Sequence, residues 1–422
     1  MSVASEDRYV SIDAVRGFAV LGILLMNIVS MGLPSFAYID PTYYGGAEGP
    51  NLWTWATNFV VADGKMRTLF TMLFGASMVL IAERAERGSR LGPVQTHYRR
   101  SFWLFVIGIA HHVFLWIGDI LMFYAVAGAL AFPLRKLKPW LLVALGLAVY
   151  FALMGHELSE QVEVARIQAA AQAPGAGPAA LEAWKQAAST LGPPPQVLQV
   201  NLTDYGSSGF WHAAKARFGM MIFRHTVISR MEYVEAFGLI LAGMGLFRLG
   251  FFTLKWPTRV YAGLIAAGYL VGVPITVYLA WRVTQARFDL AALQMMSVLS
   301  EAPRLLVAMA HASVILLMVR AGLFRSLIER LVAAGRMALS NYLASSLIGS
   351  IVFAGYGFGL YGHLQRWQLY IVVAGVWATC LLWSKPWMER FQYGPMEWVW
   401  RSLVQLKPQP FLRPRPALAP AV

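Results

Sequence analysis

The sequence of 422 residues has little that soluble enzymes use for metal or phosphate chemistry: one cysteine, Cys380, and only 13% charged residues. A single cysteine excludes an internal disulfide and a zinc site built on paired cysteines. No glycine-rich phosphate loop with a following Lys-Ser/Thr is present, so ATP hydrolysis is not expected. His156-Glu157 begins like a His-Glu-x-x-His zinc motif, but Glu160 occupies the place of the second histidine. We therefore expect no metal site.

Apolar residues dominate instead. They make up 58% of the chain, and the mean hydropathy is +0.55, which is too apolar for an ordinary soluble protein. The formal charge of +14 is compatible with nucleic acid, but the basic residues lie in short clusters between apolar runs. A bilayer surface explains that distribution better. The composition predicts the lipid bilayer as a partner and no nucleic-acid partner.

About ten segments are apolar and long enough, or nearly so, to cross a membrane. The fold class expected is all-α, a polytopic integral membrane helical bundle. A long, Ala-rich and Pro/Gly-rich stretch interrupts the apolar pattern in the middle of the chain. The expected organisation is an N-terminal membrane half with five spans (1-155), an external insert with amphipathic helices (156-232), a C-terminal membrane half with five spans (233-405) and a Pro-rich basic tail (406-422).

The loops on alternate sides differ in basic content. Residues 34-55 and 118-119 contain no Lys or Arg, whereas 83-100 and the region after 384 are rich in them. The positive-inside rule therefore predicts that both termini are cytoplasmic. The first apolar segment lacks a small-residue cleavage pattern, so we expect it to be retained as a helix. The localisation predicted is the bacterial plasma (inner) membrane, multi-pass, with the oligomeric state open, a homodimer included.

The first apolar segment carries polar side chains at membrane depth, which is costly without a reason. Arg16 and Asn27 are eleven residues apart, so on a helix they lie about 20° apart around the axis and roughly 16 Å apart along it. One stripe of this helix is therefore polar. Either the stripe bonds to neighbouring helices or it belongs to a functional site.

Several motifs together resemble the bacterial YeiB-type membrane proteins, including their domain of unknown function 418. The resemblance covers nearly the whole chain apart from 156-210. The matching segments are Ser11 to Ile28, Gly64-Lys65, Leu69 to Gly75, Arg99-Arg100, Gly108 to His111, Gly118 to Leu121, Gly335 to Leu343 and Phe391 to Arg401.

A more distant similarity implies chemistry. In the first helix an arginine is followed, after ten intervening residues, by a polar residue. This pattern resembles that of the membrane acyltransferase-3 and heparan-glucosaminide acetyltransferase groups. That resemblance implies functional roles for Arg16 and Asn27. The chain departs from both groups, because it has no histidine at position 27 and none between Asn27 and His97.

Acyl transfer needs a base and donors for the developing oxyanion. His111 and His112 are adjacent in an apolar segment, and we favour His111 as the base because it falls within a family motif. Asn27 and Lys65 are expected at a depth in the membrane similar to that of His111, so their side chains could reach the same site as hydrogen-bond donors. Asp119 is predicted at the outer mouth, about 12 Å along the same helix face and too far to orient His111. The alternatives are an interhelical hydrogen bond for His111 and snorkelling for Lys65.

A second cluster lies at the predicted inner boundary. Guanidinium groups there suit the phosphates of coenzyme A, although the positive-inside rule alone also produces such residues. A further polar patch runs from Ser340 to Ser346, suited to lining a passage or bonding to adjacent helices. The candidate cofactor-binding residues are Arg16, Arg99, Arg100 and Arg336.

These observations lead to the hypothesis of a membrane acyltransferase. It would move an acyl group, most simply acetyl, from cytoplasmic acetyl-CoA to a small-molecule or glycan acceptor at the outer face. The alternative is a transporter or exporter of a small anionic solute, whose path the same polar groups line. A non-catalytic membrane scaffold is the third class, and it predicts that none of these residues matters beyond folding.

Overall fold

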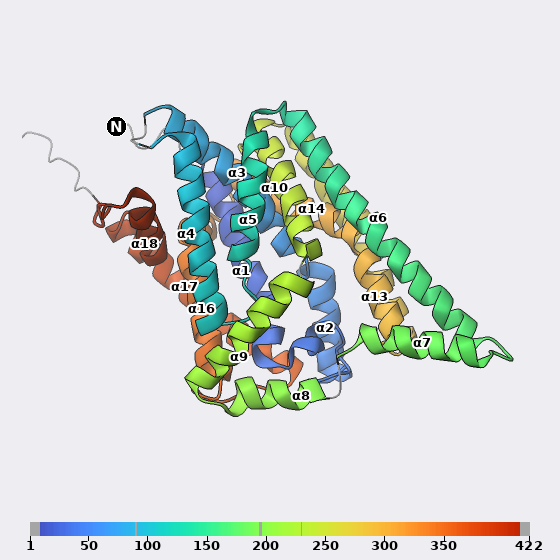
Figure 1. Cartoon of the computed structure of the whole chain (residues 1–422). Helices are drawn as coiled ribbons and strands as arrows, with labels where there is room; N and C mark the ends of the chain where they lie inside the picture. The colour runs from blue at the N-terminus through green and yellow to red at the C-terminus, as the bar shows by residue number, and fades with distance from the viewer. Residues whose placement is uncertain (1–8, 89–90, 194–195, 229, 414–422) are drawn as a thin grey trace, which may run out of the picture.

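The computed structural model describes residues 9–88, 91–193, 196–228 and 230–413, and their regular structure is helical. The all-α bundle predicted from the sequence is confirmed (Figure 1). The α-helices are α1 (Val10–Gly32), α2 (Gly49–Val61), α3 (Lys65–Glu86), α4 (Pro93–Phe114), α5 (Leu121–Ala131), α6 (Pro139–Gln172), α7 (Pro178–Leu191), α8 (Gln196–Asn201), α9 (Phe210–Phe223), α10 (Arg230–Arg248), α11 (Thr258–Ala267), α12 (Val273–Gln285), α13 (Leu290–Leu299), α14 (Glu301–Ala321), α15 (Arg325–Arg336), α16 (Ala338–Phe353), α17 (Leu369–Arg390) and α18 (Pro395–Gln405).

Helix α1 forms the centre of the bundle. Most of its residues are buried, and α3, α14, α15, α16 and α17 all pack against it. We call the end at which α1 and α4 begin the N-terminal end, and the end at which they finish the opposite end (Figure 1). The polar stripe on α1 therefore lies among other helices, and its Arg16 has partners on α3 and α15.

Six helical stretches of the described chain are long and apolar enough to cross a membrane, which identifies the chain as a membrane protein. The other apolar segments form α4, α5, α10 and α16, which are shorter or carry more charge. Helix α5 has only 11 residues, about 16 Å at the usual helical rise, and a 3-10 helix (Phe132–Lys136) continues it directly. The count of ten spans and the cytoplasmic termini stay predictions.

The middle of the chain is more helical than the sequence pattern indicated. Helix α6 continues 17 residues beyond the predicted end of its span at 155, to Gln172, and stands along one edge of the molecule (Figure 1). Helix α9 lies within the insert for which amphipathic helices were expected, and it packs against α4. Its Arg217 is buried and donates to the carbonyl of Phe114 at 3.4 Å and to the hydroxyl of Tyr356 at 3.1 Å. This segment therefore covers the opposite end of the bundle.

Helices α1 and α15 approach so closely that only glycine fits between them. A Cβ added to Gly17 would lie 1.9 Å from the carbonyl oxygen of Leu331, and one added to Gly335 would lie 1.9 Å from that of Asp13. Both clashes are with backbone, which cannot move aside as a flexible side chain can. Small residues at such positions allow membrane helices to pack backbone to backbone.

We expect Gly335→Ala to lower the melting temperature of the detergent-purified protein. The added methyl group must push α1 away from α15, and overpacking of this kind typically costs about 1–3 kcal/mol. Gly263→Ala is the matched control, because a Cβ at Gly263 on α11 has no atom within 4 Å. Equal melting temperatures for the two variants would contradict the close approach.

Candidate functional site

A cavity of about 450 Å³ opens at the N-terminal end of the bundle, between α1, α3, α4, α5, α16 and α18. Its polar lining is mainly cationic, with five guanidinium groups against two carboxylates. The charged lining residues are Arg16, Arg84, Arg100, Arg336, Arg401, Asp13 and Glu397. We call this space the arginine-lined cavity; its excess of positive charge suits an anionic ligand.

Arg16 is held in place by neighbours from three helices. Its Nη1 donates to Asp13 Oδ1 at 2.8 Å and its Nη2 to Ser77 Oγ on α3 at 2.9 Å. Nη1 also lies 3.5 Å from the carbonyl oxygen of Gly335. Because three elements hold the guanidinium, it has a fixed position in the wall of the cavity, as a ligand-binding group needs.

The structure separates the two adjacent arginines of α4. Arg100 lines the arginine-lined cavity, with its guanidinium carbon 3.8 Å from the centre of the Trp400 ring. Arg99 does not belong to the lining, and its Nη1 donates to the carbonyl of Val404 at 3.2 Å. Neighbours on a helix point about 100° apart, so the pair cannot face the same space. Of the four arginines proposed for the cofactor, the cavity brings together Arg16, Arg100 and Arg336.

Glu397 joins α18 to the start of α16. Its Oε1 accepts from the backbone N–H groups of Leu339 at 2.7 Å and Ser340 at 3.2 Å, and its Oε2 accepts from Ser340 Oγ at 2.5 Å. Burial raises the pKa of this carboxyl, and the hydrogen bond from Ser340 acts in the opposite direction. Two first-turn N–H groups of α16, which have no partner within the helix, are thereby satisfied. Arg401, four residues after Glu397 on α18, lies over the ring of Tyr393.

At the centre of the bundle, three side chains from separate segments form a hydrogen-bonded chain. Asp119 Oδ1 lies 2.8 Å from His111 Nδ1, and His111 Nε2 lies 2.8 Å from Ser346 Oγ. The exposed fractions of the three residues are 0%, 2% and 1%. We call this the central triad. It links α4, the turn before α5, and α16.

The prediction that Asp119 lies too far from His111 to orient it is wrong. It assumed that the helix continues to position 119, but α4 ends at Phe114 and the chain turns back before α5. Asp119 lies just before α5, and its Oδ2 accepts from the backbone N–H of Met122, in the first turn of that helix, at 2.8 Å. A Cβ on Gly108 would lie 2.9 Å from that same oxygen, so a glycine here makes room for the carboxylate. Asp119 is fully buried rather than at an open mouth.

The central triad separates two cavities. A small second cavity of about 30 Å³, lined by Ser30, Trp116 and Ser350 among others, lies toward the opposite end. Along α16, Tyr342 lines the arginine-lined cavity, Ser346 belongs to the triad and Ser350 lines the small cavity. Residues four apart share one face of a helix, so these three mark a line from one cavity to the other. The Tyr342 ring lies 4.9 Å from the ring of His111.

The other two proposed catalytic residues have different surroundings. Asn27 is half-buried on α1, one turn before Ser30, and its backbone carbonyl accepts from Ser30 Oγ at 3.2 Å. Lys65 is buried at the start of α3, where its Nζ donates to the carbonyl of Phe59 at 2.5 Å and lies 5.1 Å from the Phe59 ring. Among the contacts of the described residues, none joins Lys65 or the side chain of Asn27 to His111.

His112 differs sharply from His111. It is also fully buried, but within the described residues neither of its ring nitrogens has a hydrogen-bond partner. Its ring lies 5.9 Å from that of His225. The structure thus distinguishes the two histidines as the sequence interpretation did, and it is His111 that has a carboxylate on one nitrogen and a hydroxyl on the other.

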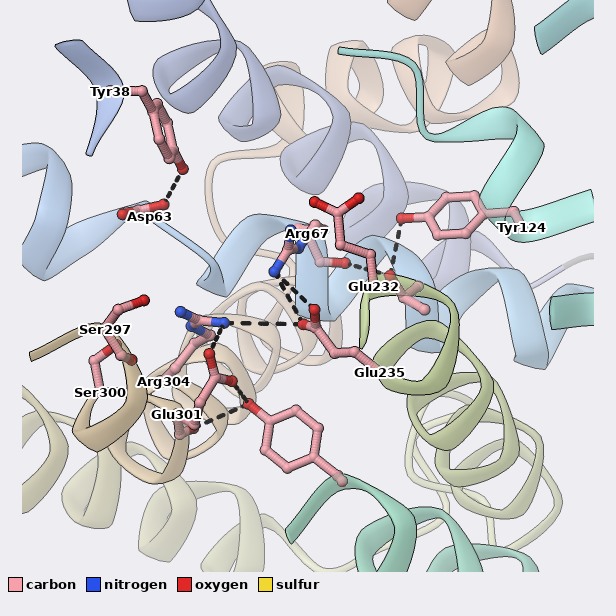
Figure 2. A network of polar contacts seen from close by, with 12 residues as sticks. Tyr38, Asp63, Arg67, Tyr124, Glu232, Glu235, Ser297, Ser300, Glu301 and Arg304 are labelled. Carbon is pink, nitrogen blue, oxygen red and sulfur yellow. Dashed lines mark hydrogen bonds and ion pairs between the residues drawn. The ribbon is translucent and has the colours of Figure 1, made fainter. Parts of the chain in front are cut away.

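A second polar cluster, which was not predicted from the sequence, is shown in Figure 2. Arg67 on α3 pairs with Glu235 on α10 at 2.8 Å, and Arg304 on α14 lies 3.8 Å from Glu235 and pairs with Glu301. Tyr38 bonds to Asp63, Tyr150 bonds to Glu301, and a cavity of about 240 Å³ lies among these residues. We call this the charged network. In the sequence, the charged network is indicated by charged residues at the starts of apolar helices.

The charged network and the arginine-lined cavity share helix α3. Thr71, one turn after Arg67, shares a hydrogen bond of 2.8 Å with the hydroxyl of Tyr124, and Tyr124 lines the arginine-lined cavity. Ser77 and Arg84 follow farther along α3 in the cavity wall. Polar groups therefore occur along much of the length of this helix.

Comparison with known proteins gives a consistent set of relatives. A family described as protein of unknown function (DUF418) matches residues 246–407. "Uncharacterized protein YeiB" of Escherichia coli (strain K12) is 31% identical over 94% of this chain and 96% of its own length. "Uncharacterized protein YxaH" of Bacillus subtilis (strain 168) is 27% identical, with 97% of each chain covered. No solved structure matches.

Proposed function

The chain belongs to the YeiB family of membrane proteins, and from its own side chains we propose that it is an acyl-CoA-dependent acyltransferase. It would bind an acyl-CoA, most simply acetyl-CoA, in the arginine-lined cavity and transfer the acyl group to an acceptor that reaches His111 from the opposite end. The observation that carries this proposal is the position of the His111–Asp119 pair directly beyond a cavity rich in guanidinium groups.

The cavity suits coenzyme A in charge, and its volume is that of an ordinary ligand pocket. Guanidinium groups bind phosphates through paired, charge-assisted hydrogen bonds, and Arg16, Arg100 and Arg336 all line the space. Its volume of about 450 Å³ falls within the range of roughly 300–1,000 Å³ that is usual for ligand pockets. With the phosphates at the arginines, the narrow pantetheine arm would point toward Tyr342 and His111.

His111 has the arrangement of a general base. Asp119 accepts a hydrogen bond from Nδ1, which leaves the lone pair of a neutral ring on Nε2. Nε2 is the atom that points at a hydroxyl group in this structure. It is therefore the atom that would remove a proton from an attacking hydroxyl or amine. Acceptors could be small molecules or glycans.

The alternative function is export or transport of a small anionic solute. The run of polar groups along α3 from Arg67 to Arg84 favours it, because a solute path needs polar groups at several depths. The two functions differ in their products. An acyltransferase releases coenzyme A, whereas a transporter moves its solute unchanged.

The test is calorimetric titration of the detergent-purified protein with acetyl-CoA, repeated on Arg100→Ala and Arg99→Ala. We expect saturable binding that Arg100→Ala weakens roughly tenfold or more, as for a lost charge-assisted contact. Arg99→Ala should stay within about twofold of the wild-type dissociation constant, because Arg99 lies outside the cavity lining. No binding by the folded wild-type protein, or equal losses in both variants, would contradict the proposal.

A further inference from the structure

We infer that Ser346 carries the acyl group as a covalent ester between donor and acceptor, so that transfer proceeds through two half-reactions. This inference rests on the proposed acyltransferase function. It identifies a nucleophile that neither the family nor the sequence motifs assign. The observation behind it is that the central triad ends on a hydroxyl group, at 2.8 Å from His111 Nε2.

The order of contacts is the one that activates a serine. A carboxylate on Nδ1 fixes the tautomer of the imidazole, and Nε2 then accepts the proton of the hydroxyl group. Asp119 and Ser346 occupy those two positions at equal distances of 2.8 Å. Ser346 Oγ also lies 3.3 Å from the carbonyl oxygen of Tyr342, within its own helix. The shorter contact to His111 is the one that gives the hydroxyl group a base.

A purely structural serine would not need this carboxylate. Serines in membrane helices commonly bond to a carbonyl four residues earlier, as Ser345 does with Asn341 at 2.7 Å. Ser346 instead has its shortest contact with a histidine that a buried carboxylate orients. The neighbouring serines Ser345 and Ser350 donate to backbone carbonyls at 2.7 and 2.6 Å, and neither has a contact with a histidine among those of the described residues.

The position of Ser346 suits an acyl carrier. It lies one helical turn from Tyr342 in the arginine-lined cavity and one turn from Ser350 in the small cavity. A coenzyme A bound at the N-terminal end and an acceptor at the opposite end therefore need not meet. The acyl group alone has to pass the level of the triad, once the Tyr342 side chain moves aside to admit the thioester.

The chemistry balances without any further reactant. In the first half-reaction, Ser346 Oγ attacks the thioester carbonyl, its proton passes to His111 Nε2, and the C–S bond breaks. The departing thiolate takes that proton and leaves as free coenzyme A. In the second, an acceptor hydroxyl or amine attacks the ester carbonyl and gives its proton to Nε2. The bond from carbon to Ser346 Oγ then breaks, and the serine recovers the proton.

The inference is tested by incubating the full-length, detergent-purified protein with radiolabelled acetyl-CoA in the absence of acceptor. We expect up to one acetyl group per chain, retained after acid quenching, located on the peptide that contains Ser346 and matched by an equal amount of free coenzyme A. Ser346→Ala should remove the label, and Ser345→Ala should keep it. Unchanged acetyl-CoA affinity in both variants would establish that they are folded.

Ser346→Cys provides a second, independent measurement. A thioester in place of the oxygen ester should be removed by neutral hydroxylamine, whereas the wild-type ester should resist it. Acetyl-CoA binding without any label on the wild-type protein, or label that persists in Ser346→Ala, would overturn the role of Ser346 and leave the proposed function standing. Absence of acetyl-CoA binding in the folded protein would overturn the proposed function itself.

Discussion

Substitution His111→Ala is expected to lower the release of coenzyme A from acetyl-CoA by about a thousandfold, because a positioned base contributes roughly 10²–10⁴ to such steps. Asp119→Asn should lower it at least about a hundredfold, since the amide can present an N–H to Nδ1 and so favour the wrong tautomer. The measurement is the initial rate of thiol release by the purified protein. Acetyl-CoA affinity should change little, because neither side chain lines the arginine-lined cavity.

The control for this pair is His112→Gln. His112 is as deeply buried as His111, but within the described part of the chain its ring nitrogens have no hydrogen-bond partner. A polar residue of similar length should therefore leave thiol release within a few-fold of wild type. If His111→Ala released coenzyme A at the wild-type rate, His111 would not be the base.

The second large effect concerns stability rather than chemistry. Glu235→Ala should destabilise the protein by about 3–5 kcal/mol, the usual cost of leaving a buried charge without its partner. Glu235 is shared by Arg67, at 2.8 Å, and Arg304, at 3.8 Å, and its side chain is 12% exposed. The measurements are the melting temperature in detergent and the yield of monodisperse protein from membranes.

Two further variants test whether the loss of stability comes from leaving a buried charge unpaired. Glu232→Ala removes a carboxylate whose side chain is 33% exposed, so it should cost less than about 1 kcal/mol. The double variant Arg67→Met with Glu235→Leu removes the pair together and should recover much of the loss. A melting temperature of Glu235→Ala equal to that of wild type would contradict a supporting role for the charged network.

The sequence predicted those parts of the site that depend on a single helix. The spacing of Arg16 within the first apolar segment required a polar face there, and the structure places its guanidinium in a cavity wall. The preference for His111 over His112 rested on a motif, and the contacts of the two rings distinguish them in the same sense. Local periodicity was the signal for Arg16, and a sequence motif was the signal for His111.

The remaining parts depend on how separate segments meet, which a single sequence does not encode locally. The relation of Asp119 to His111 depends on where α4 ends. Asp119 directly precedes an apolar run, and an aspartate in that position is common at the start of a helix. This pattern was the signal in the sequence that a new helix begins there. Ser346 was recognised only as part of a polar patch, because its partner is 235 positions away. Lys65 was grouped with His111 on depth alone, and depth does not determine which side of the bundle a residue faces.

The arginine-lined cavity and the central triad also bear on how the chain can be divided. Arg16, Arg100, His111 and Asp119 come from the first third of the chain, whereas Arg336, Ser346 and Glu397 lie in the region that matches DUF418. Neither region holds all the residues of the arginine-lined cavity and the central triad. Under the proposed function, the DUF418 region therefore supplies only part of the active centre, and it is not expected to act as a portable module. A genome that encoded the two regions as separate genes would have to express both and assemble them.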